Sequence, residues 1–374
     1  MEFKKTLIFA LLSGMVSAAL SISIPLYLDS MGYSLPDIGF MLGMATLLSA
    51  LLGIALAALS DHLGRRILIS LYSVVSAGGT AIMAFIPSPI AFVSGRALSS
   101  MAGSSQWNLL LARVSDLSRK ENRAAMVGVY IAAFALSYSL SHIAAGMFID
   151  AFGFQAIFAA IVASTLILAG VALLFAETGK RKHRFHLSLN VLKTRDGKLN
   201  MLVSFCTGFT NIASMYVLYI FLARHFGFDA TGVGLFIAAT YILWSVFSYL
   251  LGPHIDRKGL RKMLFLGALI NSSAWFAAIY FQDFLPFLLL MMLDNMSWPL
   301  YGLSATKIST ILPEHENRGR DISIFGFANT LGAIAASFMG GFLAEMSFGY
   351  VFAARAAAVL LSGCIVFFLM RIKD

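Results

Sequence analysis

The stretch GPHIDRKGLRK at residues 252–262 decides the fold, because its pattern occurs twice in the chain. SDHLGRR at residues 60–66 has the same order: an aspartate, two residues, a glycine and then basic residues. Asp61 and Asp256 are 195 positions apart, and three other pairs share this separation: Glu121 and Glu316 in two ENR segments, Gly146 and Gly341, and Asp150 and Glu345. Four matches at one separation predict that the chain consists of two similar halves.

Both copies lie between long apolar runs, which indicates a membrane protein. Of the 374 residues 59% are hydrophobic and 12% are charged, with a mean hydropathy of +0.84, whereas soluble domains carry about 25% charged residues. A helix of ~20 apolar residues crosses ~30 Å of hydrocarbon. Twelve runs qualify: 6–28, 35–59, 67–86, 88–112, 124–149, 153–176, 199–223, 229–252, 262–281, 284–308, 321–345 and 349–370. The first run is too long for a cleaved signal and leads into further spans, and ten-residue segments of alternating polarity, typical of a membrane barrel, do not occur.

The expected fold class is therefore all-α and integral to the membrane, with twelve transmembrane helices in two six-helix repeats. An even number of helices leaves both halves facing the same way, so the repeats are parallel and related by an axis along the membrane normal. We expect a first half at residues 1–176, a cytoplasmic linker at 177–198 and a second half at 199–374. The linker carries seven basic and two acidic residues, which favours contact with an anionic lipid surface.

The basic residues predict the orientation in the cell membrane. With a cytoplasmic amino terminus, all but three of the 27 lysines and arginines fall on cytoplasmic segments, and both termini are cytoplasmic. The exceptions are Arg224 in an outer loop and Arg96 and Arg355 within apolar runs. The net charge of +9 is therefore explained by topology, and it does not indicate nucleic-acid binding. Cys206 and Cys364 lie inside apolar runs and are interpreted as packing residues.

Two six-helix halves with Asp-x-x-Gly-basic loops after the second and eighth runs resemble the major facilitator superfamily of transporters, over essentially the whole chain. The family's loop signature is Gly-x-x-x-Asp-Arg-x-Gly-x-Arg-Lys. The second copy matches it with Gly252, Asp256, Arg257, Gly259, Arg261 and Lys262. The first copy keeps Asp61, Gly64, Arg65 and Arg66, but has Ala57 and His62 at the positions of the first glycine and the arginine.

The loop residues have two interpretations. Gly64 and Gly259 permit tight turns, and each aspartate precedes a helix whose unpaired N–H groups favour an anion. On one view the loop is a capped turn with positive charges that set topology. The resemblance implies instead a latch that closes the cytoplasmic side, in which Asp61 pairs with an arginine at the end of the fourth run, here Arg113.

Three charged side chains lie well inside apolar runs, where a charge usually faces a cavity or a partner. Arg96 lies about eight residues into the fourth run and Asp294 about ten into the tenth. Because the repeat maps Arg96 onto position 291, the two charges lie at similar depth, and the resemblance places their helices along a central cavity. They are expected to form a pair, bind solute or carry a proton. Arg355, six residues after Gly349, is expected to extend to the outer headgroups.

Further candidates are polar residues in the runs that the resemblance places around the cavity. His142 is either a histidine bonded to a neighbouring carbonyl or a proton carrier, since its charge changes near neutral pH. Asn211, Asn295 and Trp298 are expected to contact solute. The family's antiport motif Gly-Pro-x-x-Gly-Gly keeps one glycine here, Gly146, with His142 at the proline position and Ala145 at the other glycine.

These features predict a secondary transporter that moves a small polar or anionic organic solute by alternating access, coupled to protons. No GxxxxGK[ST] loop for ATP occurs in the sequence. Proton-driven efflux of amphipathic drugs is an alternative, favoured by the aromatic and methionine content of residues 284–308. A membrane enzyme is a distant alternative, because no DDxxD, HxxxxD or HExxH cluster is present. We expect no cofactor and no metal. The expected partners are the solute, protons and membrane lipids. The chain is expected to be a monomer.

Overall fold

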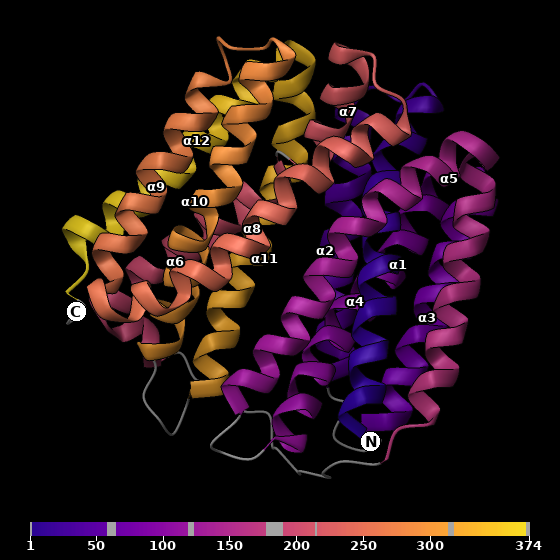
Figure 1. The fold of residues 1–374 in the computed structure, drawn as a ribbon, viewed down its shortest axis with the longest axis horizontal. Coiled ribbons are helices and arrows are strands. Elements are labelled where there is room, and N and C mark those ends of the chain that lie inside the picture. Colours follow the sequence, from indigo (N-terminus) through magenta and orange to yellow (C-terminus); the bar gives the residue numbers. More distant parts are fainter. Residues whose placement is uncertain are drawn as a thin grey trace. The chain divides into compact units, whose positions relative to one another are not determined.

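The computed structural model describes residues 2–57, 65–118, 123–176, 190–213, 215–312 and 318–371, and every regular element in these ranges is a helix (Figure 1). In chain order they are α1 (Glu2–Ser30), α2 (Leu35–Ala57), α3 (Arg65–Phe85), α4 (Pro89–Leu117), α5 (Arg123–Leu173), a 3₁₀ turn at Asn190–Lys193, α6 (Arg195–Ala213), α7 (Met215–Phe226), α8 (Ala230–Lys258), α9 (Leu260–Ala277), α10 (Phe284–Ile311), α11 (Arg318–Met346), α12 (Phe348–Cys364) and a π-helical turn at Ile365–Leu369.

The described helices fit the membrane class predicted from the sequence. Seven of them are long and apolar enough to cross a membrane by length and composition. The apolar runs 124–149 and 153–176 both lie in α5, where Gly153 interrupts the helix with φ 81° and ψ 173°. This left-handed φ is accessible to glycine without a side-chain clash, so the predicted break between two spans occurs at that residue.

The structure describes the run 199–223 in two parts, α6, which ends at Ala213, and α7, which begins at Met215. Ser214 between them lies outside the described residues. The Thr210 carbonyl of α6 accepts a hydrogen bond from the side chain of Arg355. A charged side chain from α12 therefore contacts the backbone of α6 within this run.

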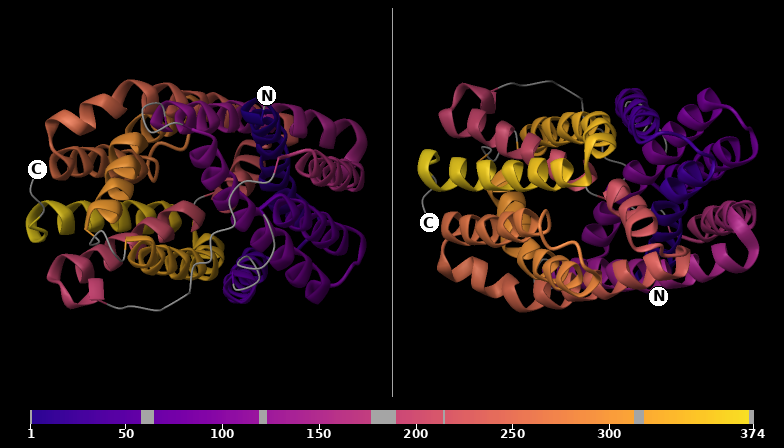
Figure 2. Two further views of the ribbon diagram at one scale, coloured as in Figure 1. Left: turned by 90° about the horizontal axis from the view of Figure 1, so that it is seen from below. Right: turned by 90° about the horizontal axis from the view of Figure 1, so that it is seen from above.

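Two compact units make up the described chain. The first contains residues 1–31, 44–185 and 227–238, and the second contains residues 32–43, 186–226 and 239–374. In the first, a core between α1, α3, α4 and α5 includes Phe9, Ile69, Val114 and Tyr130. In the second, α12 packs on α9 and α6 (Figure 2), around a core that includes Leu264, Tyr301 and Val359. The start of α2 thus groups with the second unit, and the start of α8 groups with the first.

Glycines make these two exchanges possible by allowing backbone contact. A Cβ on Gly146 of α5 would collide with the Ala230 carbonyl of α8, and a Cβ on Gly341 of α11 would collide with the Leu35 carbonyl of α2. The next contact along each crossing pairs Gly234 of α8 with the His142 carbonyl and Gly39 of α2 with the Ser337 carbonyl. Corresponding residues of the two crossings are 195 positions apart, which is the separation found in the sequence.

The residues that cap the starts of α2 and α8, Ser34 and Asp229, are also 195 positions apart. Ser34 accepts a hydrogen bond from the Asp37 backbone N–H at 3.3 Å, and Asp229 accepts one from the Gly232 N–H at 2.7 Å. A side-chain oxygen that satisfies an early N–H is the usual device for starting a helix. In addition, α8 receives Asp150 from α5, which accepts from the N–H groups of Ala230 and Thr231 at 3.1 and 2.7 Å.

Candidate functional site

Asp294 is the centre of a buried polar cluster in the second unit. Its side chain points from α10 towards α9 and α12. Oδ1 accepts hydrogen bonds from Asn271 and from the Trp275 indole N–H, the latter at 2.8 Å. Arg355 lies 3.3 Å from the same oxygen and forms an ion pair with it. An ion in a membrane interior needs such partners, because an uncompensated charge at the centre of a helix costs ~2.5–3.5 kcal/mol on insertion scales.

The expectation that Arg355 extends to the outer headgroups is wrong. Its side chain is only 7% exposed and turns inward to Asp294. One guanidinium nitrogen also donates to the Thr210 carbonyl. The group lies over the indole rings of Trp275 and Trp298, 4.7 and 5.4 Å from the ring centroids, where the ring quadrupole attracts a cation. The cation is therefore satisfied inside the helix bundle and does not need the headgroups.

The residues of the first unit that correspond to the Asp294 cluster carry no charge. The positions 195 residues before Asn271, Trp275 and Asp294 are held by Ser76, Thr80 and Ser99. These hydroxyls also meet, with Ser76 and Thr80 each 3.4 Å from Ser99. The position that corresponds to Arg355 is Ala160. The two units thus share a polar contact between neighbouring helices, but only the second carries an ion pair at these positions.

His142 belongs to a second polar cluster, between α1 and α5. The imidazole is fully buried. Nδ1 lies 2.8 Å from the Tyr138 carbonyl and Nε2 lies 3.0 Å from the Ser21 hydroxyl. The Tyr138 hydroxyl reaches the same serine at 3.3 Å. The structure therefore agrees with the carbonyl-bonded interpretation of His142 and leaves its second nitrogen in contact with a hydroxyl group.

Arg96 lies on α4 in the first unit and is partly buried. The ion pair found for Asp294 is with Arg355, so the predicted pair of Asp294 with Arg96 is not the one described. Of the three ionisable candidates, Arg96 and His142 lie in the first unit and Asp294 lies in the second.

The other expected solute contacts are less fully described. Asn295 is partly buried and donates to the Met291 carbonyl of its own helix at 3.0 Å. Trp298 is partly buried, with its ring 5.3 Å from that of Tyr301. Asn211 lies in the last turn of α6, but its side chain is outside the described set. Within the described residues no group of three or more His, Cys, Asp or Glu gathers as metal ligands would.

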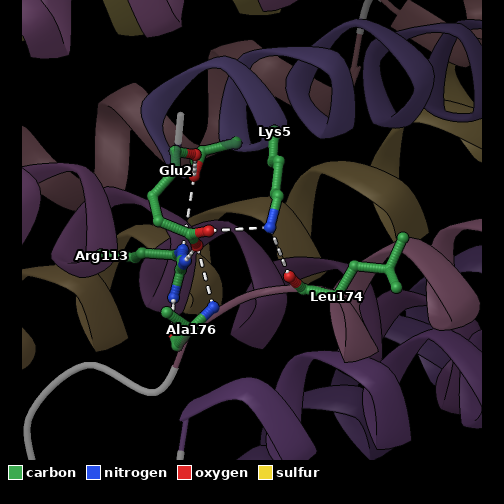
Figure 3. A network of polar contacts seen from close by, with 6 residues as sticks. Glu2, Lys5, Arg113, Leu174 and Ala176 are labelled. Atoms are coloured by element: carbon green, nitrogen blue, oxygen red, sulfur yellow. Dashed lines mark hydrogen bonds and ion pairs between the residues drawn. The ribbon is translucent and has the colours of Figure 1, made fainter.

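Arg113, the expected partner of Asp61, lies in a polar network at the ends of α1, α4 and α5 (Figure 3). It is fully buried and pairs with Glu2 at 2.6 Å, while a second nitrogen donates to the Ala176 carbonyl at 2.7 Å. The guanidinium lies 4.3 Å from the centroid of the Phe175 ring. Asp61 lies outside the described residues, so the expected pair stays a prediction.

The remaining loop residues are only partly described. Gly64 lies outside the described residues. Four other residues are placed in helices, but their burial and contacts are outside the description: Arg65, Gly252, Asp256 and Arg257. Gly259 joins α8 to α9 with a φ of 89°, a conformation that favours glycine. Arg261 donates to the Phe367 carbonyl, whereas Arg66 and Lys262 are exposed. The described basic residues thus include one that joins α9 to the end of the chain and two that face outward.

Reasoning from the sequence missed three partners. Glu2 precedes the first apolar run, so nothing marked it as the partner of Arg113. Asn271 and Trp275 are ordinary residues of an apolar helix by sequence, and their four-residue spacing is the one signal that could have placed them on the same helix face. That spacing does not identify which helix Asn271 and Trp275 face.

The comparisons with known proteins agree on one fold. The family model described as Major Facilitator Superfamily matches residues 6–191 and 201–374. No curated protein matches the sequence. Among solved structures, a mutant of the nucleoside transporter NupG has a TM-score of 0.83 at 13% identity, with coverage of 98% of this chain and 99% of that chain.

Two further solved structures extend the comparison. A D-xylose–proton symporter has a TM-score of 0.78 at 15% identity, with coverage of 98% of both chains. A bacterial homologue of the human lysosomal transporter Spinster, in an inward-facing and unoccupied conformation, has a TM-score of 0.78 at 14% identity, with coverage of 98% of this chain and 95% of that chain. At these identities the similarity shows the fold alone.

Proposed function

The chain belongs to the Major Facilitator Superfamily, a family of transporters and not of enzymes, and from this premise we propose that it moves a small polar or anionic organic solute across the cell membrane by alternating access, coupled to protons. The observation that carries the proposal is the match of the family model along almost the whole chain. The solute class follows from the polar and cationic groups buried within its apolar helices.

Two parallel six-helix repeats, at residues 1–176 and 199–374, form the moving halves in this proposal, joined by the linker at 177–198. The contacts of Gly146 with α8 and of Gly341 with α2 support it, because they repeat at the separation of 195 residues. Similar halves can rock about a site between them and open it to each side in turn. The proposal includes cytoplasmic termini and a monomer surrounded by lipid.

Arg96 is the proposed attachment point for an anionic solute. It is a partly buried cation within an apolar helix of the first unit, whereas the Arg355 cation is compensated by Asp294. A guanidinium binds carboxylate and phosphate groups through its fork of N–H donors. Asn211, Asn295 and Trp298 are proposed to give shape and hydrogen-bond specificity. Asp294 is proposed to hold Arg355 and the helices around it in place.

The cytoplasmic loops are proposed to form the latch. In this proposal Asp61 and Arg113 hold the cytoplasmic side closed, and the basic residues of both loops bridge nearby helix ends. Arg113 is suited to this because it already binds two other chain segments, the start of α1 through Glu2 and Thr6 and the residues after α5 through the Ala176 carbonyl. The substitution Asp61→Asn is expected to lower transport while the protein still folds.

The test starts from a thermal-shift screen of polar metabolites, organic anions and amphipathic dyes on the purified protein. Each stabilising compound is then tested for saturable counterflow in proteoliposomes. Counterflow of polar or anionic compounds supports the proposal. Counterflow of amphipathic dyes alone would identify the drug-efflux alternative, and stabilisation without any flux of the stabilising compounds would refute solute transport.

A further inference from the structure

We propose that His142 and Ser21 form the proton-binding site of this transporter, in which rotation of the Ser21 hydroxyl accommodates both charge states of the histidine. The inference rests on the proposed proton coupling and deepens it by locating the proton. It also separates the ionisable candidates, since the geometry favours His142 and disfavours Asp294.

The contact at Nδ1 fixes one proton of the imidazole. Nδ1 lies 2.8 Å from the carbonyl oxygen of Tyr138, which can only accept a hydrogen bond. Nδ1 therefore carries hydrogen in the neutral ring as well as in the charged ring. The proton that is gained or lost is then the one on Nε2, which faces the Ser21 hydroxyl at 3.0 Å.

Ser21 offers a partner for Nε2 in either state. A hydroxyl has one hydrogen and two lone pairs. When the ring is neutral, Ser21 donates its hydrogen to Nε2. When the ring is protonated, Nε2–H donates to Ser21 Oγ, and the hydroxyl hydrogen turns to the Ala18 carbonyl, 2.8 Å away. Both arrangements use atoms already in position, so the two charge states differ at this contact by rotation about one bond.

The Tyr138 hydroxyl reinforces the protonated arrangement. It donates to Ser21 Oγ at 3.3 Å, and its ring meets the imidazole edge to face with centroids 4.8 Å apart. The Ser21 oxygen then has two lone pairs for two donors, Tyr138 and Nε2–H. Tyr138 is itself a titratable group that faces the imidazole, and Arg96 on α4 is a partly buried cation of the same unit.

Asp294 lacks such a second arrangement. Its Oδ1 accepts from Asn271, Trp275 and Arg355, and these donors complement an ionised carboxylate. Neutralising the carboxylate would leave the buried guanidinium without its counter-charge, which is unfavourable for a buried ion pair. The carboxylate is thus suited to structure and the imidazole to exchange of a proton.

The position of His142 also explains how protonation would be linked to conformation. The imidazole is closed off from solvent in this structure, and Gly234 at the start of α8 packs on its backbone carbonyl. This part of α8 comes from the second half of the sequence but packs on α5 of the first. A proton on Nε2 can therefore exchange only when helices around His142 separate, as alternating access requires.

The test needs no solute. The full chain is labelled with ¹⁵N-histidine, reconstituted in lipid nanodiscs and titrated from about pH 5 to about pH 8, the range in which histidine ordinarily changes charge. The signals missing from His142→Gln identify His142. The expected result is that Nδ1 stays protonated throughout while Nε2 gains a proton on acidification. Ser21→Ala is expected to lose this step, and Ser21→Thr, which keeps the hydroxyl, is expected to retain it.

His225→Gln provides the matched control, because His225 is exposed and stacks on Phe221 of its own helix. It should leave the His142 step unchanged. A His142 that stays neutral over the whole range in the wild-type protein would overturn the proposal, even if the Ser21 variants do not fold. An unchanged step in Ser21→Ala would overturn the role of the hydroxyl.

Transport assays distinguish a failure of this site from a failure of proton coupling. With a solute from the screen, His142→Gln is expected to keep counterflow and to lose accumulation driven by a pH gradient. Accumulation equal to wild type in His142→Gln would place the proton elsewhere and overturn the site. Absence of gradient-driven accumulation in the wild-type protein, with the NMR step present, would instead contradict proton coupling and leave the proton site standing.

Discussion

At the scale of single residues, Arg355 connects four helices of the second unit. From α12 it reaches the Thr210 carbonyl of α6, Asp294 of α10 and Trp275 of α9. The contact with α6 lies near the point where that helix ends. We infer that the ion pair stabilises the arrangement of α6 next to the proposed solute path.

Replacing Arg355 by glutamine should destabilise the protein strongly. Asp294 would remain buried without its counter-charge, which typically costs about 3–5 kcal/mol. The double variant Arg355→Gln with Asp294→Asn removes both charges and should recover part of the loss. Unfolding in detergent measures both effects, with exposed Arg224→Gln as the control. Equal stability of the single and double variants would show that the pair is not coupled.

The role of Arg355 could not be predicted from its position in the sequence. Counting residues from Gly349 gives depth along a helix, and depth alone allowed an arginine to reach the headgroups. The partner, Asp294, lies 61 positions away on another helix, and the corresponding residues of the first half are Ser99 and Ala160, which carry no charge. The repeat therefore predicted where similar helices lie and could not predict which of their faces meet.

At the scale of helices, the crossings of α5 with α8 and of α11 with α2 depend on glycines. Gly146 and Gly341 had been identified in the sequence by their separation alone. The structure gives the physical reason for both, since each contacts a carbonyl at the start of another helix. These residues were predictable as equivalent, but their partners Ala230 and Leu35 were not, because tertiary packing selects them.

Gly146→Ala should push α8 away from α5 and destabilise the protein by about 1–3 kcal/mol, as overpacking usually does. Gly341→Ala should have a similar effect at the equivalent crossing. Gly170→Ala is the matched control on α5, because a Cβ there has open space around it. Its effect should be neutral or stabilising by up to about 1 kcal/mol. Thermal unfolding of the three variants measures this, and a Gly146→Ala protein as stable as Gly170→Ala would contradict the described crossing.

The Arg113 network should hold the start of α1 against the end of α5. Arg113→Lys keeps the charge but loses the fork that reaches both Glu2 and Ala176 (Figure 3). A buried acceptor left without a donor costs about 1–3 kcal/mol. We expect faster hydrogen exchange in the first turn of α1, with exposed Lys4→Gln as the control. Unchanged exchange in Arg113→Lys would show that the network does not anchor α1.

At the scale of the whole molecule, the distribution of basic residues predicts that both termini and the linker at 177–198 face the cytoplasm. Tags placed at either terminus or within the linker should be accessible from the same side of the membrane, and a tag at 227–229 from the other. Labelling of intact and permeabilised cells with an impermeant reagent measures this. Access to a terminal tag from outside intact cells would contradict the expected topology.

The all-helical membrane class and the family were both accessible from the sequence, because a series of long apolar runs and a doubled loop signature are properties of residues along the chain. The contact of Arg355 with the Thr210 carbonyl in the run 199–223 was not, because the length of an apolar run does not identify which side chain of another helix reaches its backbone. The identity of the solute depends on side-chain contacts. Neither the lengths of the apolar runs nor the separation of 195 residues between the repeats determines these contacts.

The measurement that tests the central claim most directly is solute accumulation in proteoliposomes under an imposed pH gradient, with the orientation of the protein determined by a terminal tag. The account predicts saturable accumulation that follows the direction and size of the gradient and that a protonophore abolishes. Saturable flux that only equilibrates the solute, with the same rate with and without a gradient, would contradict proton-coupled transport.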